Sequence, residues 1–213
     1  MGSLWATDDA NAWQDSLAEV GKRLEALENP KLTELERWFF DELPDALSKR
    51  KPMHLTSDEL VKIVEWKLTR GKWRPKLLDY AKAHSEDTVR EATASAFKSL
   101  IDAPTNSENL KEAMSALTAL KGIGPATASA LLTAAFPDVP FQSDEAMAAA
   151  LNGQKEYTSS FYFKYAAKVQ ERASTLSKKG ATLTPKDVER ALWSEAAQHM
   201  KPKKAAGSTK RKR

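Results

Sequence analysis

The 213-residue chain lacks cysteine altogether and has no long apolar run. Without cysteine it can form no disulfide, zinc–thiolate site or iron–sulfur cluster, which fits a reducing compartment. No apolar stretch approaches the roughly 20 residues that a membrane-spanning helix needs. The first residues also lack the charged and apolar regions of a signal peptide. We therefore expect a soluble intracellular protein with no membrane partner.

Several catalytic patterns are missing as well. The three histidines, His54, His84 and His199, are far apart in the sequence and have no metal-ligand spacing. There is no Ser-His-Asp grouping, and no glycine-rich loop ends in the Gly-Lys-Ser/Thr of a nucleotide-binding site. We expect neither a metal nor an organic cofactor.

Acidic residues are absent from residues 201–213, which carry seven basic side chains. Since the whole chain has a net charge of +4, the first 200 residues are slightly acidic. Basic clusters at 201–204 and 210–213 resemble a bipartite nuclear-import signal, although a solubilising tail would have the same composition. Segments this polar do not bury themselves, so we expect a disordered tail. The predicted location is the nucleus, with the import machinery as a partner.

Apolar residues recur at helical spacing along nearly the whole chain, and no segment alternates as a strand would. One amphipathic helix is predicted over Trp13–Leu27, and a second, from Leu32, should stop before Pro44 because proline disfavours helical geometry in the preceding residue. Capping residues Thr56, Ser85 and Thr184 predict three more helix starts. A further helix is expected from 106–107 up to the Gly-Ile-Gly turn, and others near 125–136, 144–151 and 160–176. The prediction is an all-α domain over residues 1–200 with about ten helices.

The segment Leu120–Ala128 joins two of these predicted helices through a Gly-Ile-Gly turn. Glycine has no Cβ, so Gly122 and Gly124 can adopt positive φ and let another backbone come close. Pro125 suits the first position of the following helix, where its missing N–H costs nothing. The N–H groups at such a helix start, with the positive end of the helix dipole, form a seat for a phosphate. The turn therefore predicts a contact with a nucleic-acid backbone.

An aspartate, Asp144, follows Gly122 by 22 residues, after a loop that contains Pro137 and Pro140. This combination of turn, proline-containing loop and aspartate, over residues 107–151, resembles the helix-hairpin-helix (HhH-GPD) DNA glycosylase superfamily. The segment 66–75 is similar to the Amun-like branch of that superfamily. The resemblance implies a DNA glycosylase-like helical fold in which Asp144 is the catalytic carboxylate. It implies double-stranded DNA as the partner of a monomer, with backbone contacts from Lys121, Gly122, Ile123, Gly124 and Thr127.

The sequence departs from this family pattern in three places. Ala126 occupies the position at which strand-cleaving members carry a Schiff-base lysine, so the resemblance implies a monofunctional glycosylase whose activity stops at base removal. The four cysteines of the family's iron–sulfur cluster are absent. Glu145, Ala146 and Met147 replace the His- or Arg-containing run that follows the aspartate in several relatives, which leaves the lesion unidentified. Glu145 is either a second carboxylate of the site or an exposed residue of the first helical turn.

These residues fit three hypotheses. The first is a monofunctional glycosylase that removes a damaged or modified base. The second is a non-catalytic DNA-binding module in repair, chromatin or transcription. In the third, the turn serves only a structural or protein-interaction role. Ser143 and Asp144 are both favoured helix caps, and capping alone would explain the aspartate.

Two aromatic groups raise a similar question. The basic and aromatic residues between Lys62 and Lys76 could line a nucleic-acid path, with cations on phosphates and rings for stacking. We expect Trp66 and Trp73 to be buried, with some of the neighbouring basic side chains on phosphates. The aromatic residues of segment 161–165 are expected mainly in the core, and one of them at the border of a base pocket is the alternative.

Overall fold

The computed structural model describes residues 3–202, and every regular element in that range is helical. The predicted all-α class is therefore confirmed for these residues, and residues 203–213 of the predicted disordered tail lie outside them. The elements are η1 (Leu4–Ala6), α1 (Ala10–Ala18), α2 (Val20–Ala26), α3 (Pro30–Arg37), the π-helical η2 (Trp38–Glu42), α4 (Leu43–Ser48), α5 (Ser57–Arg70), α6 (Pro75–Lys82), α7 (Glu86–Leu100), α8 (Ser107–Thr118), α9 (Pro125–Ala135), α10 (Asp144–Ala150), α11 (Ser159–Lys178) and α12 (Pro185–Ala197).

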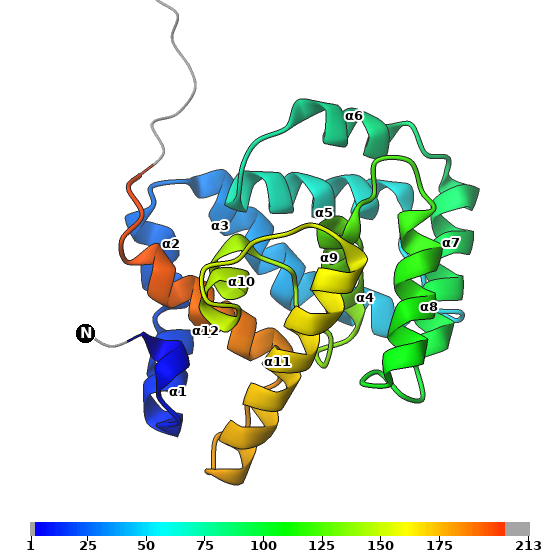
Figure 1. Ribbon diagram of the computed structural model, residues 1–213. Helices are drawn as coiled ribbons and strands as arrows, with labels where there is room; N and C mark the ends of the chain where they lie inside the picture. The colour runs from blue at the N-terminus through cyan, green and yellow to red at the C-terminus, as the bar shows by residue number, and fades with distance from the viewer. Residues whose placement is uncertain (1–2, 203–213) are drawn as a thin grey trace, which may run out of the picture.

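Helices α5 and α9 lie near the centre of the molecule, and the others surround them (Figure 1). The apolar surface of α9 explains its position, because every residue from Thr127 to Ala134 is buried. Helices α7 and α8 pack against each other on one side. On the opposite side α12 contacts η1, α1 and α2, so the first and last helices of the described chain share one interface. There the backbone N–H of Leu4 donates to Glu195 Oε1 at 2.6 Å.

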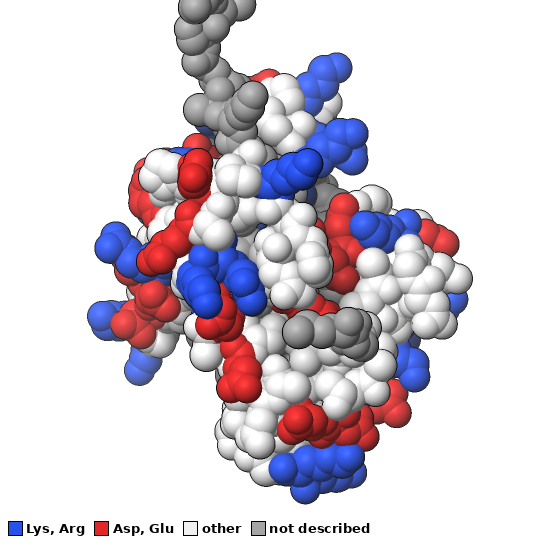
Figure 2. Space-filling view, turned by 90° about the vertical axis from the view of Figure 1, so that its left-hand side faces the viewer, with Lys and Arg blue, Asp and Glu red and all other residues white. Residues whose placement is uncertain are grey.

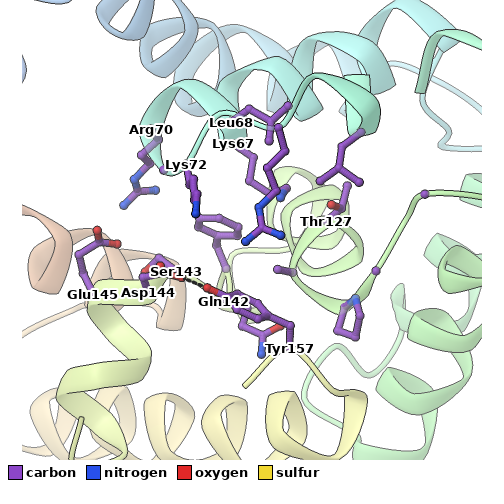
Figure 3. A pocket seen from close by; sticks show the side chains of 18 residues that line it. Lys67, Leu68, Arg70, Lys72, Thr127, Gln142, Ser143, Asp144, Glu145 and Tyr157 are labelled. Atoms are coloured by element: carbon purple, nitrogen blue, oxygen red, sulfur yellow. Dashed lines mark hydrogen bonds between the residues drawn. The ribbon is translucent and has the colours of Figure 1, made fainter. Parts of the chain in front are cut away.

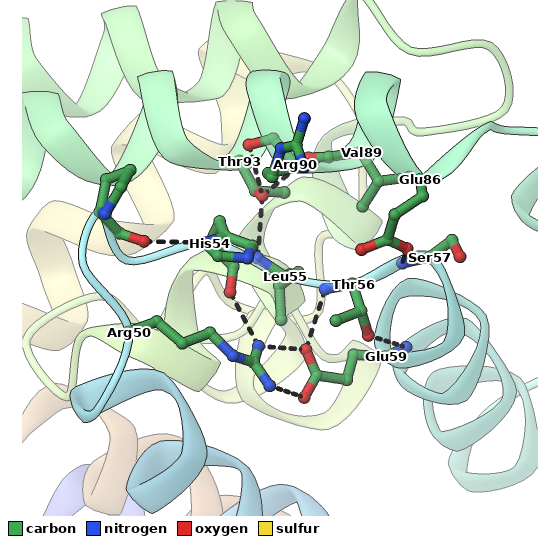
Figure 4. Close-up of polar contacts among 11 residues, drawn as sticks. Arg50, His54, Leu55, Thr56, Ser57, Glu59, Glu86, Val89, Arg90 and Thr93 are labelled. Atoms are coloured by element: carbon green, nitrogen blue, oxygen red, sulfur yellow. Dashed lines mark hydrogen bonds and ion pairs between the residues drawn. The ribbon is translucent and has the colours of Figure 1, made fainter.

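The predicted helix starts are confirmed, and the best-connected one is at Thr56. Thr56 and Glu59 form a reciprocal capping box at the start of α5. Arg50 donates two hydrogen bonds to Glu59, at 2.6 and 2.7 Å, and a third to the carbonyl of His54 (Figure 4). Burial opposes the ionisation of Glu59, but the bonds from Arg50 and Thr56 outweigh it, so the pKa of Glu59 is lowered. This cluster fixes the entry of the chain into α5.

Two of the predicted helix boundaries are wrong. The single helix expected over Trp13–Leu27 breaks at Glu19 into α1 and α2, although Trp13, Val20 and Leu24 all reach the core as the pattern required. The helix expected to stop before Pro44 instead continues through η2 into α4. The N–H of Leu43 donates to the carbonyl of Trp38, five residues earlier. This turn therefore holds one residue more than an α-helical turn, and the chain stays helical up to the proline.

The core between the helices holds the loop that precedes α10. The ring of Trp66 stacks on that of Phe39, with 3.9 Å between the ring centroids, and packs against that of Phe141, with 5.0 Å between the centroids. From α11, the hydroxyls of Tyr162 and Tyr165 donate to the carbonyls of Pro140 and Phe141, respectively. These contacts fix the backbone of residues 140–141 immediately before the predicted catalytic aspartate.

A buried ion cluster joins α3, α5 and α12 behind the same loop. Arg70 lies 2.9 Å from Glu189 Oε1 and 3.6 Å from Glu36 Oε1, and each of the three side chains is at most 3% exposed. Burial by itself would lower the pKa of Arg70, but the negative charges of Glu189 and Glu36 have the larger effect and raise it. The guanidinium also lies over the rings of Trp66 and Trp193.

The outer surface carries both signs of charge. On the side of the molecule shown in Figure 2, acidic and basic side chains are interspersed. None of the helices within residues 3–202 combines the length and apolarity that crossing a bilayer requires.

Candidate nucleic-acid site

A cavity of about 290 Å³ opens where the end of α5, the start of α9 and the start of α10 meet. Figure 3 shows the labelled side chains converging on it, with Lys67 and Leu68 from α5, Thr127 from α9 and Asp144 from α10. Its volume is near the lower end of the roughly 300–1,000 Å³ typical of small-molecule sites. It is lined by Lys67, Leu68, Arg70, Gly71, Lys72, Arg74, Leu77, Gly122, Gly124, Pro125, Ala126, Thr127, Phe141, Gln142, Ser143, Asp144, Glu145 and Tyr157.

The turn between α8 and α9 packs against α6 and the residues that follow it. Gly122 has a φ of +83°, which disfavours any residue with a Cβ. A Cβ built on Gly122 would lie 2.5 Å from the Cβ of Tyr80, so the glycine also permits close packing on α6. A ring nitrogen of His84 donates to the carbonyl of Lys121 at 2.9 Å, and Lys121 Nζ lies 5.2 Å from the centre of the Tyr80 ring. Gly122 is thus required by the fold itself.

Gly124 differs from Gly122 in both respects. Its backbone is extended, with a φ of −88°, and no atom would lie within 4 Å of an added Cβ. It is also the N-cap residue of α9, and it has no side chain to satisfy the first N–H groups of that helix. Within residues 3–202 the N–H groups of Gly124 and Ala126 donate to no other atom of the protein. Both residues line the cavity, so two main-chain donors without a partner in the described chain belong to its wall.

Asp144 is the first residue of α10, and it does not cap that helix. Ser143 is the cap, because its hydroxyl accepts from the N–H of Ala146. The carboxylate of Asp144 instead lines the cavity and accepts a hydrogen bond of 2.6 Å from the hydroxyl of Tyr157. Burial, followed by the hydrogen bond to Asp144 and its negative charge, raises the pKa of Tyr157 to about 12. Tyr157 therefore stays protonated and donates to Asp144 at neutral pH.

The charges around the cavity are unequal, with four basic and two acidic side chains in its lining. Arg70 is held by the buried cluster described above, whereas the side chains of Lys67, Lys72 and Arg74 make no hydrogen bond or ion pair with the rest of residues 3–202. Glu145, one of the two acids, borders the cavity and is half-buried. The basic excess favours an anionic ligand.

The structure brings together most of the site residues predicted from the sequence. Gly122, Gly124, Thr127 and Asp144 all border the cavity. Lys121 is exposed beside it, and the side chain of Ile123 is buried at 3% exposure, so that only the main chain of Ile123 remains for any backbone contact.

Two aromatic predictions have different outcomes. Trp66 is fully buried as expected, but the prediction that Trp73 is buried is wrong, because its indole is 52% exposed. Trp73 lies in the short loop between α5 and α6. The aromatic residues 161–165 do not border the cavity, and three of them are buried in the core.

Sequence reasoning missed Tyr157 as a site residue. It lies 13 residues after Asp144, in the loop between α10 and α11, where no periodicity or motif marks it. The fold alone brings its hydroxyl to the carboxylate.

Comparison with known proteins gave no match among protein families, curated proteins or solved structures. Residues 3–202 also contain no group of three or more His, Asp or Glu side chains arranged to hold a metal ion.

Proposed function

We propose that the protein binds double-stranded DNA through the α8–α9 turn and removes a damaged or modified base with Asp144. One observation supports this most directly. Ser143 caps α10, and the Asp144 carboxylate lines a cavity that is also lined by Gly124 and Ala126, whose N–H groups donate to no other atom of residues 3–202. The proposal thus assigns the phosphate contact and the catalytic carboxylate to one recess.

The chemistry follows from these groups. A phosphate of the strand accepts from the main-chain N–H groups at the start of α9, and Lys72 and Arg74 add positive charge nearby. The base has to leave the helical stack to reach the cavity. As the N-glycosidic bond breaks, positive charge develops on the sugar, and the Asp144 carboxylate stabilises it or takes a proton from the attacking water. Tyr157 fixes the orientation of that carboxylate.

The test compares base release from a panel of damaged duplexes by the wild type and by Asp144→Asn. We expect the variant to lose release while its duplex affinity stays within about twofold, because the amide keeps the shape but not the charge. Asp138→Asn is the matched control, since Asp138 lies in the loop that leads into α10 but does not border the cavity. Equal release by wild type and Asp144→Asn would refute the catalytic assignment.

Binding is tested separately by Gly124→Arg, whose side chain would fill the open space before the α9 donors. The proposal expects this variant to fold and to lose duplex affinity. Unchanged affinity would mean that the turn does not contact DNA.

A non-catalytic DNA-binding module is the second candidate. It is favoured by the hydrogen bond from Tyr157, which already occupies Oδ1 of Asp144. If this candidate is correct, no lesion in the panel is processed, whereas Gly124→Arg still abolishes binding. In either case we propose a nuclear location, because of the basic clusters at 201–204 and 210–213. Deleting residues 201–213 should move a fluorescent fusion out of the nucleus.

A further inference from the structure

Two basic side chains of α12 lie on the same aromatic ring, away from the cavity. Lys186 Nζ lies 5.0 Å from the centre of the Phe40 ring and 5.8 Å from that of the Phe39 ring. The guanidinium carbon of Arg190 lies 4.0 Å from the centre of the Phe40 ring. Within residues 3–202 neither side chain makes a hydrogen bond or an ion pair. Positive charge thus gathers on one ring.

The position of Lys186 in α12 adds a second unfavourable interaction. Lys186 is the second residue of the helix, so the positive end of the helix dipole lies beside its positive charge. Arg190 follows four residues later, and residues four apart are neighbours on a helix surface. The buried Nε of Arg190 has no hydrogen-bond partner in the described part of the chain. An anion in place of the Lys186 ammonium would suit both the helix start and the guanidinium.

The carboxylates near Lys186 do not supply this anion. Three of them act on Lys186 through their charge, but none forms an ion pair with it within residues 3–202: Asp187, Asp41 and Glu189. The carboxylate of Asp187 accepts two hydrogen bonds from Thr184, and that of Glu189 is held by Arg70. Two of the three are therefore committed to other partners.

The surroundings of Lys186 favour its uncharged form. Burial, followed by the positive charge of Arg190, lowers the pKa of Lys186 to about 8, and the three carboxylates offset only part of this. At about pH 8 roughly half of such an amine is uncharged, compared with under about 1% of a lysine with the ordinary pKa of about 10.4. Only the uncharged amine is a nucleophile. Because Lys186 is half-buried against two rings, a small apolar electrophile reaches it at a lower desolvation cost than a charged one does.

We propose that Lys186 Nζ reacts with carbon dioxide to form a carbamate, whose carboxylate pairs with the Arg190 guanidinium. The nitrogen lone pair attacks the carbon of CO2, and the electron pair of one C=O bond moves onto its oxygen. The nitrogen then releases one proton to water, so the side chain ends with a negative charge. No co-reactant other than CO2 is needed. Lys186 does not border the cavity, and the inference is independent of DNA binding and of base removal.

The carbamate reverses both unfavourable interactions. It places an anion in the first turn of α12, where the helix dipole stabilises negative charge. With Arg190 it forms an acid-before-base pair four residues apart, the order that stabilises helices. The backbone N–H of Lys186 also donates to the carbonyl of Pro137, which joins the modified residue to the loop that leads into α10. Dissolved CO2 should therefore stabilise the contact between α12 and this loop.

The experiment uses the full chain in carbon-13-labelled bicarbonate, a source of CO2, at about pH 8. Carbon NMR detects a carbamate as a resonance separate from those of bicarbonate and CO2. A trialkyloxonium salt then converts the carbamate into a stable ester, and peptide mapping by mass spectrometry locates and quantifies it. The N-terminal amine titrates in the same range, so the site is assigned by mapping. We expect an ester on Lys186 in the wild type, and Lys186→Arg should lose the corresponding resonance.

Lys62 provides a matched control in the same wild-type sample. Its Nζ also lies over an aromatic ring, 4.3 Å from the centre of Trp38, but beyond the first turn of its helix. The ester should be at least about tenfold less abundant on Lys62 than on Lys186. Arg190→Gln should lower the occupancy of Lys186 by about threefold or more, because it removes both the ionic partner and the charge that keeps the amine deprotonated.

Circular dichroism checks that the variants fold, and mapping of the wild type requires no variant at all. The inference is overturned if the wild type carries no ester on Lys186, or if Lys62 is modified to the same extent. A resonance pattern unchanged in folded Lys186→Arg, or an occupancy unchanged in folded Arg190→Gln, overturns it as well.

Discussion

The two glycines of the α8–α9 turn give a paired prediction, because the fold requires one of them and leaves space around the other. Alanine at Gly122 would be forced into positive φ, at a cost of about 1–2 kcal/mol. Its Cβ would also lie 2.5 Å from that of Tyr80, and overpacking of this kind costs about 1–3 kcal/mol more. Because a chain of this size loses roughly 2–4 °C per kcal/mol, Gly122→Ala should lower Tm by about 4–20 °C.

Gly124→Ala should behave in the opposite way. Its extended backbone and empty surroundings accept a methyl group without strain, so the free energy of unfolding should stay constant or rise by about 0.4–1 kcal/mol. Duplex affinity should nevertheless fall, because the methyl group keeps a phosphate away from the α9 donors. Loss of one hydrogen bond to a charged group costs about 1.5–3 kcal/mol, which corresponds to roughly 10- to 150-fold in Kd.

Two measurements check the pair: thermal unfolding followed by circular dichroism, and fluorescence anisotropy of a labelled duplex at two salt concentrations. Gly153→Ala is the control for backbone strain, since Gly153 has the same φ of +83° but no atom within 4 Å of an added Cβ. The difference in Tm between Gly122→Ala and Gly153→Ala isolates the contact with Tyr80. The reasoning is refuted if Gly122→Ala is as stable as the wild type, or if folded Gly124→Ala binds DNA with unchanged affinity.

Two further predictions concern stability. Glu59→Gln should cost about 1–3 kcal/mol at pH 7. Since the pKa of Glu59 is lowered in the fold, this difference from wild type in urea unfolding should shrink as the pH falls below about 4; a pH-independent difference would contradict it. Arg70→Met leaves Glu36 and Glu189 buried without their cation, so it should lower the free energy of unfolding by about 3–5 kcal/mol. A loss below about 1 kcal/mol would mean that water hydrates the carboxylates.

Local signals made much of the secondary structure predictable. The caps at Thr56, Ser85 and Thr184 each act within three residues, so the sequence alone identifies them. The burial of α9 was equally clear, because a helix of small and apolar residues on every face has nowhere else to lie. Only the resemblance to a family predicted that the turn and Asp144 would lie at one site.

The remaining features depend on tertiary contacts. The break at Glu19 leaves the apolar periodicity intact, so the pattern could not reveal it. The exposure of Trp73 could not be predicted, because it depends on whether a distant segment packs over the α5–α6 loop. The hydrogen bond from Tyr157 and the isolation of Lys67 result from segments distant in sequence that meet at one recess.

The interface between the first helices and α12 has a consequence for how the chain matures. Trp13 is fully buried, and its neighbour Ser16 donates to the carbonyl of Ala191, 175 residues later. During synthesis the apolar side of α1 therefore stays uncovered until α12, about 175 residues later, has left the ribosome. The interface between α12 and the first helices should therefore form late in folding. Removing either α1 or α12 should expose the same apolar surface to chaperones and proteases.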